Sequence, residues 1–411
     1  MTTEVIIKNK SGMVLAADSA VTVTSFGMNG PKRKVYNSAN KLFTLSKTEP
    51  VGILFYNSAE INGIPIELII KEFREKKQKY NTLKEYYDAL VDFIKIFVAE
   101  NAQSFELNVF FNLFCDMFIQ NTNTEKEKNK DNFSYENYIN EIIENFKAIN
   151  NQKGCGSEFP ELPLSLVSEK LHKDEKNREA FEKIISKTTY GGKIEDITPF
   201  FYEFLKLQIC QSYTGLAVCG YGINEFFPKV YKIHIYGNIE NNLMIGEFEA
   251  HEGQEAEIIP LAQKQMIETF IKGVSESIYT NLENLYFMNF DVFINSVIPS
   301  LKEDIDPHEL RCRLISLFQN NVERFKNIIY EVEEKPLIQT VNHLSREEMA
   351  ELAENLINIQ VLKYKVSPEL ETVGGPIDVA IISKHDGFVW KKRKLYFPKD
   401  LNFQFFENYF K

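Results

Sequence analysis

The sequence predicts an α+β protein built as a layered sandwich. Short runs rich in β-branched residues and separated by turns occupy the first 60 residues, and strand-like runs return near residue 214 and at the end of the chain. Long runs with the 3.6-residue period of helices lie between them. Because a sheet and a helix each bury one face against another layer, this order favours helices packed on sheets.

The predicted elements begin with two β-hairpins. Strands at 4–8 and 13–17 flank a turn that ends in Gly12, and strands at 42–45 and 52–56 flank a second turn. The period then changes to that of helices. Pro65 suits a first helical turn, and the capping-box pattern of Thr82 and Glu85 predicts the start of a second helix.

The middle of the chain predicts an inserted helical module at 104–198. Within it, helical fragments alternate with a polar linker and a loop that is rich in Gly and Pro. We expect the helical fragments at 136–148 and 164–186, the linker at 121–132 and the loop at 151–163.

Strands, helices and a last hairpin follow this module. We expect strands at 214–219, 229–236 and 243–248, helices at 260–282 and 307–331, a helix capped by Ser345, and strands at 377–383 and 388–393. The predicted division is a core in three parts, 1–103, 199–282 and 341–411, interrupted by helical insertions at 104–198 and 283–340.

Composition excludes several classes of protein. The net charge is −11 and the isoelectric point is near 5.3, which argues against nucleic-acid and anionic-membrane partners. No run of about 18 apolar residues predicts a membrane span, and the N-terminus does not read as a signal peptide. The five cysteines have no metal-site spacing, so we expect free thiols, no metal or cofactor, and a cytoplasmic location.

The strongest candidate for a catalytic residue lies at the N-terminus. Thr2 follows Met1, so removal of Met1 would place a free α-amine beside the Thr2 hydroxyl. An α-amine has a reference pKa of about 8, so it can take the hydroxyl proton near neutral pH. We therefore expect Thr2 to be a nucleophile once it is the first residue.

Several segments carry a resemblance to a known family. Thr2-Thr3-x-Val5 is followed at 12–19 by Gly-x-Val-Leu-Ala-Ala-Asp-Ser, Asn40-Lys41-Leu42-Phe43 precedes a strand pair, and 214–231 reads as a central strand pair. Together they resemble the proteasome β-subunit and HslV branch of the N-terminal-nucleophile (Ntn) hydrolases, as a divergent bacterial-type member with large helical insertions. The resemblance implies a four-layer αββα sandwich of two antiparallel sheets.

The resemblance also implies roles for particular residues. Thr2 would attack an amide carbonyl, while Asp18 would pair with Lys41 and hold its ammonium close to Thr2. That cation would lower the pKa of the Thr2 amine and stabilise the ionising hydroxyl. Backbone groups at Asn57 and Thr22 would contact the oxyanion and the substrate.

The catalytic lysine has a second candidate. Lys34 lies at the distance from Thr2 that is typical of HslV, whereas Lys41 alone is followed directly by a strand, a turn, a strand and small residues. We prefer Lys41 and expect the run at 32–34 to be a solvated loop.

The chain departs from the family pattern at three places. Asn57 stands where the family has the oxyanion glycine, and Gln263 lies where a serine is expected. The family's Asp-x-x-Ser-Gly-Gly reads Leu-Glu-Thr-Val-Gly-Gly at 370–375. Glu371 and Thr372 are the candidates to substitute there, and Thr372 and Gln263 are the predicted supporting residues.

Three functions fit these residues. The first is a threonine-type peptidase that cleaves peptide bonds through an acyl ester on Thr2; the second is an Ntn amidohydrolase that acts on a small non-peptide amide. The third is a non-catalytic, proteasome-like structural or interaction subunit. The resemblance further implies assembly into a homo-oligomer or ring, with an associated ATPase or regulator.

Overall fold

The chain is described by a computed structural model and forms two compact units. The first unit comprises 1–42, 225–228 and 252–411, and the second comprises 43–224 and 229–251. The described residues are 2–27, 30–128, 133–152, 154–157, 159–297, 306–368, 372–395, 397–404 and 407.

The first unit is built on an antiparallel sheet with the strand order β12-β1-β2-β13-β14. Strand β1 pairs with β2 through Glu4 opposite Ala17, and with β12 through Thr3 opposite Ala262. The strands are β1 (Thr3–Asn9), β2 (Gly12–Ala17), β12 (Glu257–Ala262), β13 (Asp378–Ser383) and β14 (Gly387–Lys392).

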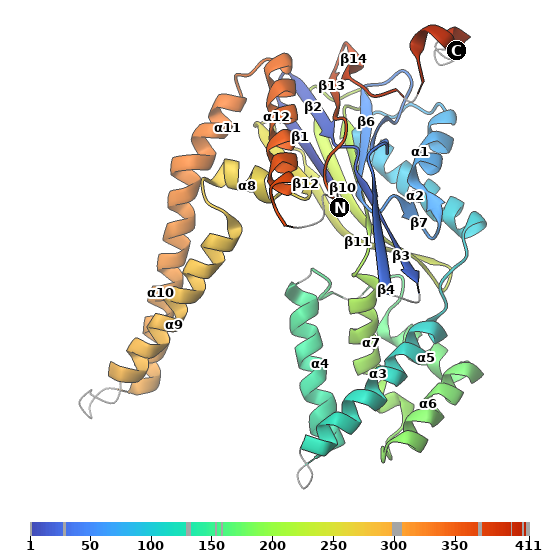
Figure 1. Cartoon of the computed structure of the whole chain (residues 1–411), viewed down its shortest axis with the longest axis vertical. Helices are drawn as coiled ribbons and strands as arrows, with labels where there is room; N and C mark the ends of the chain where they lie inside the picture. The colour runs from blue at the N-terminus through green and yellow to red at the C-terminus, as the bar shows by residue number, and fades with distance from the viewer. Residues whose placement is uncertain are drawn as a thin grey trace. The chain divides into compact units, whose positions relative to one another are not determined.

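One face of this sheet is covered by helix α12 (Arg346–Lys365), which contacts β1, β2 and β13 (Figure 1). The helix begins at a capping box, in which Ser345 and Glu348 bond each other's backbone N–H groups. Val5 and Ile7 of β1 pack with Met349 and Ala353 of α12 in one buried core. Because side chains alternate along a strand, Glu4 and Ile6 point to the opposite face.

The rest of the first unit is mainly helical. Helices α9 and α10 lie side by side, since Phe287 contacts Phe318 and Tyr279 contacts Phe325 (Figure 1). The helices are α8 (Gln265–Lys272), α9 (Glu276–Val297), α10 (Pro307–Ile329), a π-helical turn (Tyr330–Glu334), α11 (Lys335–Val341) and a 3₁₀ turn (Lys399–Leu401). Strands β3 (Val21–Gly27) and β4 (Gly30–Tyr36) form a separate antiparallel pair.

The second unit has its own antiparallel sheet, with the strand order β11-β10-β9-β6-β5. Its strands are β5 (Leu42–Thr44), β6 (Val51–Asn57), β9 (Thr214–Gly220), β10 (Lys229–Ile239) and β11 (Asn242–His251), with a short pair β7 (Glu60–Ile61) and β8 (Ile64–Pro65). Helices α1 (Ile66–Glu75) and α2 (Leu83–Asn101) share an apolar core with this sheet. The N-cap of α2 is Thr82, whose hydroxyl accepts from the backbone N–H of Glu85.

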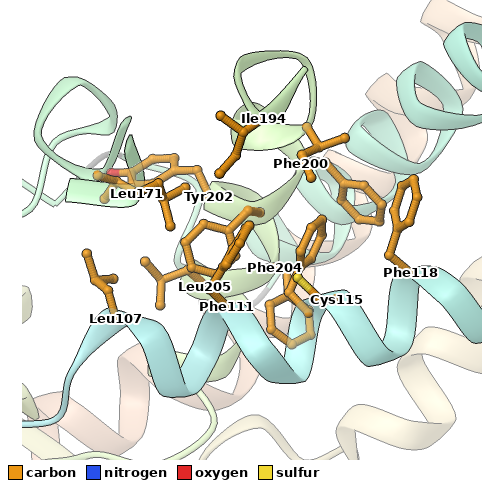
Figure 2. Packing of buried hydrophobic residues seen from close by; sticks show 14 of the residues in the cluster. Leu107, Phe111, Cys115, Phe118, Leu171, Ile194, Phe200, Tyr202, Phe204 and Leu205 are labelled. Atoms are coloured by element: carbon orange, nitrogen blue, oxygen red, sulfur yellow. The ribbon is translucent and has the colours of Figure 1, made fainter. Parts of the chain in front are cut away.

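Five helices continue the second unit: α3 (Leu107–Lys128), α4 (Tyr135–Gln152), α5 (Leu164–Lys173), α6 (Glu175–Lys187) and α7 (Ile194–Ile209). Their core is rich in phenylalanine, and Figure 2 shows Phe111 and Phe118 of α3 beside Phe200 and Phe204 of α7. Aromatic rings with centroids 4.9–5.5 Å apart, such as Phe114 with Phe200 and Phe201, give this core part of its stability.

The predicted α+β class with antiparallel sheets is confirmed, and so are the N-terminal hairpin and the strand pair of the second hairpin. Two predicted segments were wrong. The linker predicted at 121–132 is helical as far as Lys128, where a Lys128–Glu125 ion pair lines the exposed face; 129–132 lie outside the described residues. The helix predicted at 260–282 begins as strand β12 and is later interrupted at Gly273, whose φ of 65° ends α8.

Other corrections concern a helix, a loop and the cysteines. The helix predicted at 164–186 is two helices, because Asp174 ends α5 and caps α6 by accepting from the N–H of Lys176 at 2.9 Å. The run at 32–34 belongs to strand β4 rather than to a loop, because its backbone pairs with β3. Cys155 and Cys210 form a disulfide, so the expectation of free thiols was wrong for this pair.

Every helix in the described ranges is too short or too polar to span a bilayer. The predicted five-part division of the chain stays a prediction.

Candidate functional site

Thr2 lies directly before β1 and is held there by the end of β12. The backbone N–H of Gln263 donates to Thr2 O at 2.9 Å, and the Thr3 hydroxyl donates to Gln263 O. Thr2 is buried. The pairing of β1 with β12 therefore sets the position of the predicted nucleophile.

Asp18 follows β2 and lies beside the start of β1. Its carboxylate accepts hydrogen bonds from the backbone N–H groups of Thr3 at 3.0 Å, Ala20 at 3.3 Å and Gly374 at 2.8 Å. In return, the N–H of Asp18 donates to Thr3 O at 3.1 Å. A buried carboxylate with several N–H donors is held in one orientation, so Asp18 can anchor a cation.

Lys41 is that cation. Its ammonium donates to Asp18 Oδ1 and lies 3.5 Å from Glu4 Oε1, and the side chain is fully buried. The other candidate, Lys34, is an exposed residue of β4 whose ammonium lies 4.9 Å from the centre of the Tyr36 ring. Of the two lysines, Lys41 is the one that pairs with Asp18.

Glu4 belongs to the same cluster and was missed from the sequence. The Thr2 hydroxyl donates to Glu4 Oε2 at 3.3 Å, and the Glu4 side chain is 0% exposed. The pKa of the Glu4 carboxyl is raised to about 8, mainly by burial and partly by Asp18, against opposing effects of Lys41 and Thr2. A signal was present: residues two apart on a strand share a face, so Glu4 shares the face of Thr2.

A segment near the C-terminus completes the surroundings of Asp18. Besides the bond from the Gly374 N–H, Gly374 O accepts from the N–H of Ser19 at 3.0 Å, and the Ser19 hydroxyl donates to Pro376 O. Gly375 has a φ of 78°, and a Cβ there would lie 3.0 Å from Asn37 O and 3.2 Å from Ser19 Cβ. A glycine is therefore needed at 375 for the close contact with Asn37 and Ser19.

The two predicted supporting residues, Thr372 and Gln263, differ in their contacts. Thr372 is buried, and its hydroxyl has no hydrogen-bond partner among the described residues; Val373, in the position of the family's serine, is buried as well. Gln263 holds Thr2 through its backbone, whereas its side-chain oxygen accepts from the Tyr364 hydroxyl of α12. Glu371 lies outside the described residues.

The two backbone positions predicted for the oxyanion and the substrate lie in different units. Thr22 is in β3 of the first unit, opposite Val35, and its buried hydroxyl has no hydrogen-bond partner within the described ranges. Asn57 ends β6 of the second unit, has a φ of 70° and donates to Tyr213 O at 3.0 Å. This left-handed conformation favours glycine and tolerates asparagine, so Asn57 suits a place where the family has glycine.

The second unit also contains a cavity of about 650 Å³. Its lining includes Ser58, Glu60, Ser104, Tyr213 and Tyr236, and none of the predicted site residues. Among the described residues, no group of three or more His, Cys, Asp or Glu side chains could hold a metal ion. The buried cluster of Thr2, Glu4, Asp18 and Lys41 is the better candidate, because it joins a nucleophile to charged groups.

Comparison with known proteins finds similarity among solved structures alone. No known family and no curated protein matches the sequence. Two of the solved structures that match are the Anbu (Gly-1) mutant from Hyphomicrobium sp. strain MC1 and Anbu (ancestral beta-subunit) from Yersinia bercovieri. The match to the first has a TM-score of 0.29 and 10% sequence identity, and covers 100% of this chain and 92% of the Hyphomicrobium chain. The match to the second has a TM-score of 0.27 and 8% sequence identity, and covers 99% of this chain and 94% of the Yersinia chain.

These structures correct the assignment made from the sequence. Anbu is proteasome-like but is a family distinct from the proteasome β-subunit and HslV branch, so placing the chain in that branch was wrong. At these TM-scores and identities, neither structure carries an argument about the site.

Proposed function

We propose that this chain is a threonine-type Ntn hydrolase that cleaves amide bonds, with peptides as the substrate class. The observation that carries the proposal is the position of the Thr2 hydroxyl, in one buried cluster with Glu4, Asp18 and Lys41. A nucleophilic hydroxyl needs a proton acceptor and a nearby positive charge, and this cluster contains both.

The reaction would proceed through an ester. Thr2 Oγ1 attacks the amide carbonyl, the amine leaves with a proton, and water then hydrolyses the acyl ester on Thr2. The Lys41 ammonium favours the developing negative charge on Oγ1, and Asp18 holds that ammonium in place. The sequence assigns the hydroxyl proton to the Thr2 α-amine, which requires Thr2 to be the first residue.

The proposal includes the four-layer αββα sandwich. In its support, each unit has an antiparallel sheet that shares an apolar core with helices, α12 in the first unit and α1 and α2 in the second. Assembly into a homo-oligomer or ring stays a prediction, and light scattering of the purified protein measures it.

The test combines mass and labelling. We expect the intact mass of the purified protein to correspond to a chain that begins at Thr2. A β-lactone probe should then acylate Thr2, as mapped by peptide mass spectrometry, and Thr2→Ala should abolish both labelling and cleavage of a peptide library. Thr48→Ala, which removes an exposed hydroxyl, is the matched control and should leave both unchanged.

One observation favours a different function. Val373 is buried at the position that corresponds to a serine in proteasome β-subunits, and the lack of that hydroxyl suits a non-catalytic structural or interaction subunit. Retention of Met1 together with no labelling of Thr2 would favour that role. Labelling of Thr2 with turnover of small acylated amines, but not of peptides, would instead identify an amidohydrolase that acts on a small amide.

A further inference from the structure

The contact between Glu4 and Thr2 assigns a further role within the proposed site. Glu4 Oε2 accepts the hydrogen bond of the Thr2 hydroxyl at 3.3 Å, and Glu4 Oε1 lies 3.5 Å from Lys41 Nζ. We propose that Glu4 is a catalytic residue that takes the Thr2 hydroxyl proton, in place of the Thr2 α-amine. This inference rests on the proposed function, because it requires Thr2 to be the nucleophile.

The geometry satisfies the first requirement of a general base. A base must lie within hydrogen-bond reach of the proton that it removes, and such contacts are often long before substrate binds. The position of Glu4 is set by backbone pairing, since it lies opposite Ala17 of β2 and Leu261 of β12. The nucleophile and its base are two positions apart along the chain, and this spacing places both side chains on one face of the sheet.

The proton transfers balance. As Oγ1 forms its bond to the carbonyl carbon, the O–H proton passes to Glu4 Oε2 and the carbonyl electron pair moves to the oxyanion. When the oxyanion collapses, the C–N bond breaks and the leaving nitrogen takes the proton from Glu4. The carboxylate then takes a proton from the water that attacks the ester, and returns it to Thr2 Oγ1 as that oxygen leaves.

Burial makes Glu4 a stronger base than an ordinary carboxylate. Desolvation is the main cause that raises the pKa of its carboxyl, to about 8 overall; Lys41 and Thr2 oppose the rise and Asp18 adds to it. Lys41 and Asp18 are the charged groups that act on Glu4; the residues paired with it on β2 and β12 are the apolar Ala17 and Leu261. A base with a pKa near the working pH combines availability with strength.

The main experiment measures the rate of Thr2 acylation by a β-lactone, from pH 6 to pH 9, in the full chain. The wild-type rate should rise with pH and level off above about 8, following the pKa of Glu4. Glu4→Gln should lower the rate by 10²- to 10⁴-fold, the usual contribution of a general base, and abolish the rise. Glu257→Gln, which removes a carboxylate of β12 that pairs with Lys8, is the control and should match wild type.

A second variant distinguishes the role of Glu4 from that of the Thr2 α-amine. Insertion of one glutamine between Met1 and Thr2 leaves Thr2 without a free amine and keeps Glu4, so this chain should be acylated at no less than a tenth of the wild-type rate. A loss of more than 10²-fold there, or a Glu4→Gln rate within threefold of wild type, would overturn the role of Glu4. If wild-type Thr2 is not acylated at all, the proposed function itself fails.

Discussion

At the scale of single residues, the protein places three ionisable side chains in full burial. Glu4, Asp18 and Lys41 are each 0% exposed and lie in contact. Desolvation of charged groups is costly, and such a set is tolerated when each member has a partner of opposite charge or hydrogen bonds. Asp18 has both, whereas Glu4 depends on Lys41 and Thr2.

Removal of the central cation should therefore be severe. We expect Lys41→Met to lower the free energy of unfolding by roughly 3–5 kcal/mol, because Asp18 is left buried without its ammonium. It should also abolish the acylation of Thr2. Urea denaturation followed by circular dichroism measures the stability.

The rival lysine gives the control for this variant. Lys34→Met removes an exposed ammonium and should change the free energy of unfolding by no more than about 0.5 kcal/mol. Equal effects of the two variants would contradict the assignment of Lys41 to the cluster.

The glycine beside the cluster provides a second prediction at this scale. Gly375→Ala adds a Cβ at a φ of 78°, 3.0 Å from Asn37 O, so both strain and a clash should destabilise the protein. Gly387→Ala is the matched control, since Gly387 has a φ of 77° and open space around it. We expect Gly375→Ala to cost at least about 1 kcal/mol more than Gly387→Ala in thermal unfolding.

At the scale of elements, strands place the site and helices stabilise the strands. The hairpin of β1 and β2 brings Thr2, Glu4 and Asp18 together, and β12 holds the start of β1. On the other face, α12 buries Val5 and Ile7 against its own apolar side chains. A shift of β1 by one residue would turn Glu4 to the other face of the sheet, away from Asp18 and Lys41. The register of this hairpin is therefore a condition for the site.

The helices of the second unit carry a covalent link that can be tested directly. The disulfide joins Cys155, after α4, to Cys210, at the end of α7, across 55 residues. We expect three cysteines to react with iodoacetamide in denaturant without reductant, namely Cys115, Cys219 and Cys312, and all five to react after reduction.

The same link should contribute to stability. The double variant Cys155→Ser with Cys210→Ser should lose roughly 2–4 kcal/mol, because closure of a long loop restricts the unfolded chain. Equal thiol counts before and after reduction would show that the disulfide is absent.

At the scale of the whole molecule, the two units are interleaved in the sequence. The first unit takes both ends of the chain, and the second takes most of the middle. Each has its own sheet and its own apolar core. The residues of the Thr2 cluster all belong to the first unit, so the geometry of that cluster depends on contacts within one unit.

The buried carboxyl of Glu4 should make overall stability depend on pH. Its pKa is raised from 4.5 to about 8, so between these values the folded chain binds more protons than the unfolded chain. The contribution of Glu4 to the free energy of unfolding should therefore be highest below pH 4.5. It should fall as the pH rises to about 8, by up to about 1.4 kcal/mol per pH unit.

Urea denaturation at pH 6, 7 and 8 measures this slope. Glu4→Gln should flatten it, whereas Glu257→Gln, with a partly exposed carboxylate, should keep it. A slope that is the same in Glu4→Gln and in wild type would rule out Glu4 as its source.

Much of this protein could be predicted from local patterns in the sequence. The β-branched runs on either side of a turn that ends in Gly12 predict the β1–β2 hairpin, and the capping patterns at Thr82 and Ser345 predict the starts of α2 and α12. These features depend on residues a few positions apart, which is the range that periodicity and capping report. The class α+β follows from them, and the resemblance to proteasome β-subunits implies the roles of Thr2, Asp18 and Lys41.

Tertiary structure alone decided the rest, because the deciding contacts join distant parts of the chain. The bond from Gly374 to Asp18 spans 356 residues, and that from Thr3 to Gln263 spans 260. Residues 260–262 read as helix by period but pair as strand with β1, because open backbone groups at the edge of that strand require partners. The strand spacing indicates that Glu4 shares the face of Thr2, but not its chemistry, since the pKa of Glu4 changes only through its burial beside Lys41, Asp18 and Thr2.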